Sequence, residues 1–386
     1  MYYSGKKIDD LCPTAGKCGG CQLQNMDYDR QLKFKQAKVV KLLGKYVHVS
    51  PIIGMDNPYH YRNKVSAAFG TTRSGMIISG VYQSNTHTIV KTDRCMIEDE
   101  ISDEIILSIR YLIRSFKLTV YNEHTQKGFL RHVLVRRGFK TGEIMVVLVT
   151  STPLFPSKNR FLEELLKAHP NITTVVQNIN NKFTSMVLGD SEKILYGSGY
   201  IEDELCGCKF RISSKSFYQI NPVQTEKLYN LAVDFAELNG SETVIDAYCG
   251  VGTIGITVSK HAAAVVGTEL NSDAVRDAKT NAKINKIDNI RFYAEDAGEF
   301  MEKLAENGEK ADVVFTDPPR AGCSGKFLKA LVKLSPKKIV YISCDPETQA
   351  RDIRFLTENG YKVKKCQPVD MFPHTKHVET VVLLTK

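Results

Sequence analysis

Residues 244–253 read Val-Ile-Asp-Ala-Tyr-Cys-Gly-Val-Gly-Thr, an apolar stretch that ends in two closely spaced glycines. The apolar part predicts a buried β-strand. Gly250 and Gly252 predict a tight turn into a helix, because glycine lets the backbone bend sharply and approach a ligand. A helix that begins at such a turn favours negative charge at its N-terminus. The turn alone is typical of several nucleotide-binding folds and does not choose among them.

Helices and strands alternate from about residue 222 onward. A helix at 222–238 precedes the strand at 243–247, and further strands are expected at 264–269, 290–294, 312–316, 338–343, 361–369 and 379–384. Strands separated by helices imply a parallel, doubly wound α/β sheet. The last two strands leave no room for a helix between them, so we expect an antiparallel pair at the end of this sheet.

The part of the chain before residue 216 has a different pattern. Short strands at 65–69, 77–82, 130–137 and 144–149, with helices near 101–116 and 157–168, predict an α+β domain with antiparallel sheet. A helix at about 28–46 carries lysines at 33, 35, 38 and 41, and its spacing predicts a basic outer face. We therefore expect three parts: a cysteine-rich segment and basic helix at 1–50, a central domain at 51–215 and an α/β domain at 216–386.

The charge is unevenly distributed along the chain. The net charge is +9; residues 1–200 hold 27 lysines and arginines against 17 acids, and the remainder holds 25 against 26. A basic first half suggests a polyanion-binding part joined to a catalytic part. No apolar run reaches the length of a membrane span, and the N-terminus has no apolar signal core, so a cytoplasmic protein is expected.

Acidic residues follow the glycine turn at intervals that indicate a ligand. Glu269 ends the next strand about twenty residues later, where a carboxylate can accept hydrogen bonds from ribose hydroxyls, and Asp296 follows the third strand. This order is typical of class I methyltransferases, which use S-adenosylmethionine. A dinucleotide oxidoreductase is the competing reading, since Gly250-Val-Gly-Thr-Ile-Gly255 also fits the dinucleotide pattern. The downstream motifs decide between the two.

Three motifs suggest the chemistry: one follows the fourth strand, one ends the fifth and one begins the last. Asp317-Pro-Pro-Arg320 lacks the aromatic residue that amino-methylating enzymes carry in the last place. Cys344 ends the fifth strand, and a thiolate that adds to C6 of uracil makes C5 nucleophilic towards a methyl donor. A base must then remove the C5 proton, and Glu379 at the start of the last strand is the candidate.

Taken together, these motifs make the chain resemble the bacterial RNA uridine-C5 methyltransferases, in particular the iron–sulfur branch that acts on 23S ribosomal RNA. The signatures are Cys12-x5-Cys18-Gly-Gly-Cys21, Phe217-Tyr-Gln-Ile-Asn221, Asp246-Ala-Tyr-Cys-Gly-Val-Gly252, Asp317-Pro-Pro-Arg320, Ser343-Cys-Asp-Pro346 and His377-Val-Glu-Thr380. The resemblance implies Cys344 as nucleophile and Glu379 as base. It implies S-adenosylmethionine contacts at Gln219, Tyr248, Thr253, Glu269, Asp296 and Asp317, beside the turn at Gly250.

The resemblance also implies a [4Fe–4S] cluster in the central part of the protein. Its ligands would be Cys12, Cys18, Cys21 and Cys95. A C-x5-C-x2-C group with a remote fourth thiolate suits a cubane cluster, and a four-cysteine zinc site would need similar ligands. Methyl transfer moves no electrons, so folding or the positioning of RNA-binding loops is the expected role.

The expected partner is large-subunit ribosomal RNA, with neither DNA nor a membrane involved. The target uridine must leave its stack to reach Cys344, so a single-stranded loop or a flipped nucleotide is expected, with Phe217 and Tyr218 as candidates for lining its pocket. Many relatives carry a small β-barrel before the cysteine motif; because eleven residues precede Cys12, we expect that domain to be missing here. Phosphate binding would then fall to central basic residues: Arg62, Lys64, Arg131, Arg136 and Arg137.

Two alternatives to this reading remain open. The first keeps the chemistry and moves the substrate to transfer RNA. The second is a non-catalytic iron–sulfur protein that binds RNA during ribosome assembly, against which Cys344 and Glu379 argue.

Overall fold

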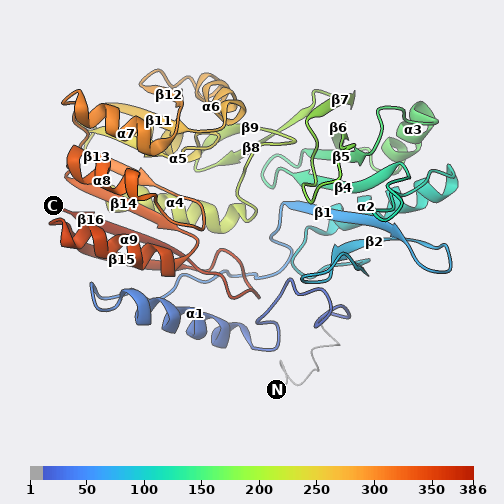
Figure 1. Ribbon diagram of the computed structural model, residues 1–386, viewed down its shortest axis with the longest axis horizontal. Coiled ribbons are helices and arrows are strands. Elements are labelled where there is room, and N and C mark those ends of the chain that lie inside the picture. Colours follow the sequence, from blue (N-terminus) through green and yellow to red (C-terminus); the bar gives the residue numbers. More distant parts are fainter. Residues whose placement is uncertain (1–11) are drawn as a thin grey trace. The chain divides into compact units, whose positions relative to one another are not determined.

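The computed structural model describes residues 12–386, which form two compact units (Figure 1). The central unit contains residues 12–27, 58–203 and 212–215, and the C-terminal unit contains residues 28–57, 204–211 and 216–386. The predicted parts are continuous stretches divided at residues 50 and 215, whereas each of the two units combines three separate stretches of the chain.

The C-terminal unit is built on a seven-stranded sheet in the order β12-β11-β10-β13-β14-β16-β15. The strands are β10 (Thr243–Ala247), β11 (Ala264–Glu269), β12 (Ile290–Ala294), β13 (Val313–Thr316), β14 (Lys338–Ser343), β15 (Lys362–Val369) and β16 (Glu379–Thr385). The first five are parallel, and β16 pairs antiparallel with both β14 and β15. The predicted doubly wound sheet and its antiparallel end are therefore confirmed.

Helices cover both faces of this sheet. They are α1 (Tyr28–Leu43), α4 (Pro222–Ala236), α5 (Thr253–Val258), the short 3₁₀ helix η2 (Ser259–His261), α6 (Ser272–Ile284), α7 (Ala297–Glu306), α8 (Gly325–Leu334) and α9 (Pro346–Glu358). Side chains of α1, α7, α8 and α9 share one core with Ile245 and Ala247 of β10. Asp246, between those two residues, points to the opposite face and accepts a hydrogen bond from the backbone of α5.

Helix α1 is amphipathic as predicted, but the prediction of an outward-facing Lys35 is wrong. Lys35 is fully buried, and its Nζ atom lies 2.5 Å from Oδ1 of Asp370 and 3.0 Å from the carbonyl oxygen of Phe372. Burial lowers the pKa of Lys35, while the charge of Asp370 opposes that shift. Through Lys35, helix α1 is therefore hydrogen-bonded to the segment that leads into β16.

Lys35→Met is expected to lower the free energy of unfolding by about 3–5 kcal/mol, because it leaves the carboxylate of Asp370 buried without its ammonium partner. Urea titration followed by far-ultraviolet circular dichroism measures this loss. Lys38→Met is the matched control, since Lys38 is partly exposed and its Nζ lies 3.2 Å from the exposed Glu347. The control should cost about 1 kcal/mol or less. Equal losses in the two variants would contradict the structural role of Lys35.

The central unit is an α+β fold around a second seven-stranded sheet, in the order β3-β2-β1-β4-β5-β6-β7. The elements are β1 (Lys64–Thr71), β2 (Ile77–Tyr82), β3 (Ile89–Lys91), α2 (Glu100–Ser115), β4 (Leu130–Arg137), β5 (Ile144–Thr150), α3 (Lys158–Ala168), β6 (Ile172–Ile179) and β7 (Ser191–Tyr196). Neighbouring strands are antiparallel except β5 and β6, which α3 connects in parallel. The predicted antiparallel α+β sheet is confirmed apart from this parallel pair.

The remaining hairpin, β8 (Tyr200–Leu205) and β9 (Cys208–Ser213), forms its own two-stranded sheet. Across residues 12–386, no helix combines the length and the apolar composition that a membrane crossing requires.

Candidate active site

The predicted glycine turn links β10 to α5 and has the strained backbone that the motif requires. Tyr248, Gly250 and Gly252 have φ values of 65°, 54° and 83°. A Cβ atom on Gly252 would lie 2.8 Å from Phe292 Cζ, so this position excludes larger residues by both conformation and space. A Cβ on Gly250 would meet no atom within 4 Å, so a ligand can approach the backbone there.

Carboxylates surround this turn at the carboxyl ends of the parallel strands. Glu269 Oε2 accepts a hydrogen bond from the Gly250 amide at 3.3 Å, and Asp296 accepts from the first amides of α7. Asp246 accepts from the Gly255 amide at 2.7 Å through Oδ2, while its buried Oδ1 has no hydrogen-bond partner among the described residues. Burial, together with the charges of Asp317 and Glu269, raises the pKa of Asp246 to about 8.

The residues present fit S-adenosylmethionine. The turn lies where β10 has β11 on one side and β13 on the other, which is the switch point at which doubly wound sheets bind ligands. A ligand with ribose hydroxyls and an ammonium group offers the donors that Glu269, Asp296 and the free Oδ1 of Asp246 can accept.

The sequence analysis missed Tyr229, which connects two of the predicted cofactor residues. This tyrosine lies in α4, and its hydroxyl makes hydrogen bonds with Gln219 and with Thr253 Oγ1, the latter at 3.4 Å. Burial raises the pKa of Tyr229 well above its usual value, and the charge of Asp317 contributes. No motif marks a tyrosine in the middle of a helix, so only the fold reveals this connection.

Strand pairing brings the two predicted catalytic residues together. In the antiparallel register of β14 and β16, Ser343 is opposite Thr380, so the next positions along the two strands are Cys344 and Glu379. Thr380 Oγ1 fixes this end of the pair by donating to Gln349 Oε1 at 2.6 Å. Cys344 is half-buried and Glu379 is buried.

Electrostatic interactions link this pair to the motif after β13. Burial, with smaller contributions from the charges of Glu379 and Asp317, raises the pKa of Cys344 to about 12, and the charge of Arg320 opposes that shift. Burial also raises the pKa of Glu379 well above its usual value, with Asp317 again adding and Arg320 opposing. The pKa of Asp317 itself is raised by burial to about 7. These four side chains therefore form one coupled site.

The two aromatic candidates for lining the uridine pocket differ in their surroundings, and two histidines precede β16. Tyr218 is buried with its ring centroid 6.3 Å from that of Phe210, which is a core position, whereas Phe217 is 65% exposed. His374 is buried, and its Nδ1 lies 3.2 Å from Gln31 Nε2 of α1. Burial lowers the pKa of His377, and Arg320 is the next largest cause.

The four cysteines predicted to bind a cluster lie in the central unit. Cys12, Cys18, Cys21 and Cys95 all line one cavity of about 310 Å³. Burial raises the pKa of three of these thiols, that of Cys21 to about 12. Within residues 12–386, no three histidine, cysteine or carboxylate side chains stand close enough to share a single metal ion. The donor set and the shared cavity fit a cluster, and the cluster itself stays a prediction.

Two of the basic residues expected to bind phosphate, Arg131 and Arg136, are held inside the fold, so that expectation is wrong for them. Arg131 and Arg136 are 4% and 5% exposed and donate to backbone carbonyl groups. Arg137 pairs with Asp99 at 2.6 Å. Burial, together with the charges of Arg136 and Arg62, lowers the pKa of Lys64 to about 8. Strand β4 is buried along nearly its whole length, which turns its arginines into structural donors.

The sequence matches a family described as tRNA (uracil-5-)-methyltransferase over residues 27–386. An uncharacterized RNA methyltransferase of Halalkalibacterium halodurans is 45% identical over 386 residues, which cover 99% of this chain and 84% of that protein. An uncharacterized RNA methyltransferase of Clostridium acetobutylicum is 46% identical over 390 residues, covering 99% and 85%.

Among solved structures, the chain resembles the tRNA (uracil-54, C5)-methyltransferase of Pyrococcus abyssi in complex with S-adenosyl-L-homocysteine. The two share 31% identity and a TM-score of 0.80, over 96% of this chain and 86% of that one. The predicted fold of the C-terminal unit, the doubly wound α/β (Rossmann-like) sheet of class I methyltransferases, is therefore confirmed.

Proposed function

Because this chain belongs to the tRNA (uracil-5-)-methyltransferase family, and is thus an S-adenosylmethionine-dependent RNA methyltransferase, we propose that it methylates C5 of a uridine through a covalent bond between Cys344 and C6. The observation that carries this proposal is the pairing of β14 with β16, which makes Cys344 and Glu379 neighbours. Membership of a family of RNA methyltransferases also argues against the alternative of a non-catalytic assembly factor.

The chemistry assigned to these residues has three steps. The thiolate of Cys344 adds to C6 of the uracil, and the electron pair of the C5–C6 bond moves towards O4 as an enolate. C5 then takes the methyl group from the sulfonium donor, which leaves as S-adenosylhomocysteine. The carboxylate of Glu379 removes the remaining C5 proton, and the C6–sulfur bond breaks to regenerate the thiolate.

The surroundings suit this sequence of steps. The positive charge of Arg320 lowers the pKa of both Cys344 and Glu379, and so favours the thiolate and the carboxylate that the reaction needs. Burial works the other way and keeps the pKa of Glu379 high, which makes its carboxylate a stronger base once it is ionised.

For the substrate, we propose a uridine of large-subunit ribosomal RNA, on the strength of the cysteine motif Cys12-x5-Cys18-Gly-Gly-Cys21 and the family resemblance that it carries. Transfer RNA is the second candidate, because the family description and the Pyrococcus abyssi enzyme both name transfer RNA. Both substrates require the same chemistry at Cys344, so the two proposals differ only in the RNA that is recognised.

The test is methyl transfer from labelled S-adenosylmethionine to separate pools of unmodified ribosomal and transfer RNA, followed by nucleoside analysis. Label in 5-methyluridine from the large ribosomal RNA is the expected result. Label in 5-methyluridine from transfer RNA would keep the mechanism and overturn the substrate. Label in any other nucleoside would overturn the role given to Cys344.

The rate of methyl transfer is expected to rise with pH, because both reacting groups have raised pKa values. Below its pKa the carboxyl of Glu379 is protonated and cannot accept the C5 proton, and the thiol of Cys344, with a pKa of about 12, is mostly protonated near neutrality. Single-turnover rates at saturating RNA should rise by up to about tenfold per pH unit between about pH 6 and about pH 9. A rate that is flat or falls over this range would contradict the assignment.

We propose, finally, that Cys12, Cys18, Cys21 and Cys95 hold a [4Fe–4S] cluster. Their shared cavity and all-thiol donor set support a cluster bound by four thiolates. When bound, the cluster would cross-link residues 12–21 to the segment around Cys95, and so fix the loops of the central unit.

A further inference from the structure

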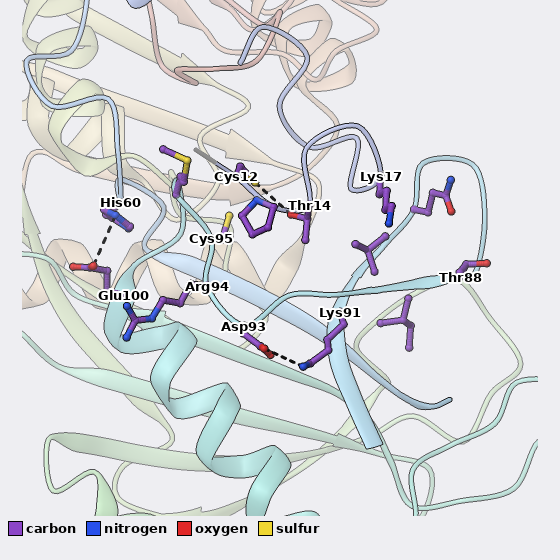
Figure 2. Close-up of a pocket in the computed structure, with 15 residues that line it drawn as sticks. Cys12, Thr14, Lys17, His60, Thr88, Lys91, Asp93, Arg94, Cys95 and Glu100 are labelled. Carbon is purple, nitrogen blue, oxygen red and sulfur yellow. Dashed lines mark hydrogen bonds and ion pairs between the residues drawn. The ribbon is translucent and has the colours of Figure 1, made fainter. Parts of the chain in front are cut away.

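Beside the cysteine cavity the central unit has a second, larger cleft, which the proposed methyl transfer at Cys344 does not use. Its volume is about 900 Å³, within the range of ligand-binding pockets. It lies between the first cysteine loop, β3 and the segment before α2, and Cys12 and Cys95 contribute to its lining (Figure 2). Four basic side chains line it: Lys17, His60, Lys91 and Arg94.

Ion pairs within the cleft leave two of these cations available. The carboxylate of Asp93 is shared by Lys91 at 3.1 Å and Arg110 at 2.7 Å, so it is already neutralised. Glu100, the other acid of the cleft, lies 3.9 Å from His60 Nε2. Lys17 and Arg94 are exposed, and in the part of the chain that the structure describes neither has a carboxylate at ion-pair distance. The cleft therefore has uncompensated positive charge.

The two free cations lie far apart across the cleft, and each is adjacent in sequence to a cysteine. Lys17 precedes Cys18 and Arg94 precedes Cys95. Figure 2 shows Lys17 and Arg94 on opposite sides of the cleft, with the side chains of Thr14 and Thr88 also on its lining. Two cations with neutral donors such as Gln83 nearby suit a chain of phosphates better than one compact anion.

We propose that this cleft binds the phosphodiester backbone of the substrate RNA, with Lys17 and Arg94 each contacting a phosphate. The inference rests on the proposed function. It gives the substrate RNA a contact surface besides the catalytic site at Cys344, formed by residues that the sequence had not singled out. Lys17 and Arg94 would make the phosphate contacts that were expected of the buried arginines of β4, which donate to backbone carbonyl groups instead. It also explains how thiolate ligands at Cys18 and Cys95 would help RNA binding, because they would fix the backbone beside both cations.

The test is fluorescence anisotropy with an end-labelled fragment of unmodified RNA from the pool that accepts methyl groups, or of ribosomal RNA if neither pool does, titrated at several salt concentrations. Lys17→Ala combined with Arg94→Ala is expected to weaken binding by about 10- to 100-fold. The slope of log K against log salt should shrink by about 1.4, which corresponds to two lost phosphate contacts. The matched control is Lys158→Ala combined with Arg160→Ala, which removes the same charge from exposed positions of α3 outside the cleft.

A second pair of substitutions keeps the test independent of folding. Lys17→Arg combined with Arg94→Lys preserves both charges and should retain binding, and the iron content and melting temperature of all variants should match the wild type. Wild-type affinity and salt slope in the double alanine variant would overturn the proposal, and so would an equal loss in the α3 control. If the wild type binds RNA through this cleft but methylates neither pool, the proposed function fails and the cleft assignment stands.

Discussion

Cys344→Ala is expected to lower the rate of methyl transfer by about 10⁴-fold or more, because the variant cannot form the bond to C6 that makes C5 nucleophilic. Binding of S-adenosylmethionine should survive, since the cofactor residues around the glycine turn do not depend on the thiol. Single-turnover assays measure the first effect, and isothermal titration calorimetry with S-adenosylhomocysteine measures the second.

The control for this variant is Cys206→Ala. Cys206 is half-buried like Cys344 and lies outside the catalytic site, so its loss should leave the rate near the wild-type value. Methylation of C5 by Cys344→Ala at a substantial fraction of the wild-type rate would show that the reaction proceeds without a covalent adduct.

Glu379→Gln is expected to slow turnover by about 10²- to 10⁴-fold and to accumulate a covalent complex between protein and RNA. The amide can neither accept the C5 proton nor prevent the earlier addition of Cys344, so the reaction stops after methyl transfer. A denaturing gel detects the complex as a labelled band of reduced mobility. Glu358→Gln, at an exposed position of α9, should form no such band. A slowed Glu379→Gln enzyme without any adduct would mean that Glu379 acts before the adduct forms.

The same variant should be folded, and its stability gives an independent check on the buried carboxyl. The pKa of Glu379 is raised above its usual value of 4.5, so the folded wild type binds this proton more tightly than the unfolded chain does. Wild-type stability therefore falls as pH rises from about 4.5 towards the folded pKa, whereas the glutamine does not titrate. The melting temperature of Glu379→Gln relative to the wild type should increase over that interval.

Sequence patterns predicted the two sheets well because strand and helix periodicities differ and the strands are strongly apolar. They also placed Cys344 and Glu379 at strand ends. They could not show that these residues are neighbours, because that depends on β16 reversing direction and pairing with β14 in one register. The contribution of Tyr229 was hidden for a similar reason, since its partners Gln219 and Thr253 lie in other segments.

The errors came from assigning charged residues to the surface by type. Lys35 is spaced four residues from both Gln31 and Val39, and all three lie on the buried stripe of α1. The spacing was visible in the sequence, but its partner Asp370 is more than 300 residues away. Arg131 and Arg136 were misjudged because a central strand buried on both faces can use arginine to satisfy carbonyl groups. Long-range partners of this kind cannot be inferred from local pattern.

The covalent role of Cys344 is tested most directly with substrate RNA that contains 5-fluorouridine. Fluorine at C5 cannot be removed as a proton is, so the wild-type enzyme should stop after methyl transfer with the RNA still attached. Nuclease and protease digestion followed by mass spectrometry should find a methylated fluorouridine nucleotide on the peptide that contains Cys344. An adduct on another residue, or no adduct from an enzyme that methylates C5 of the ordinary RNA, would contradict the account.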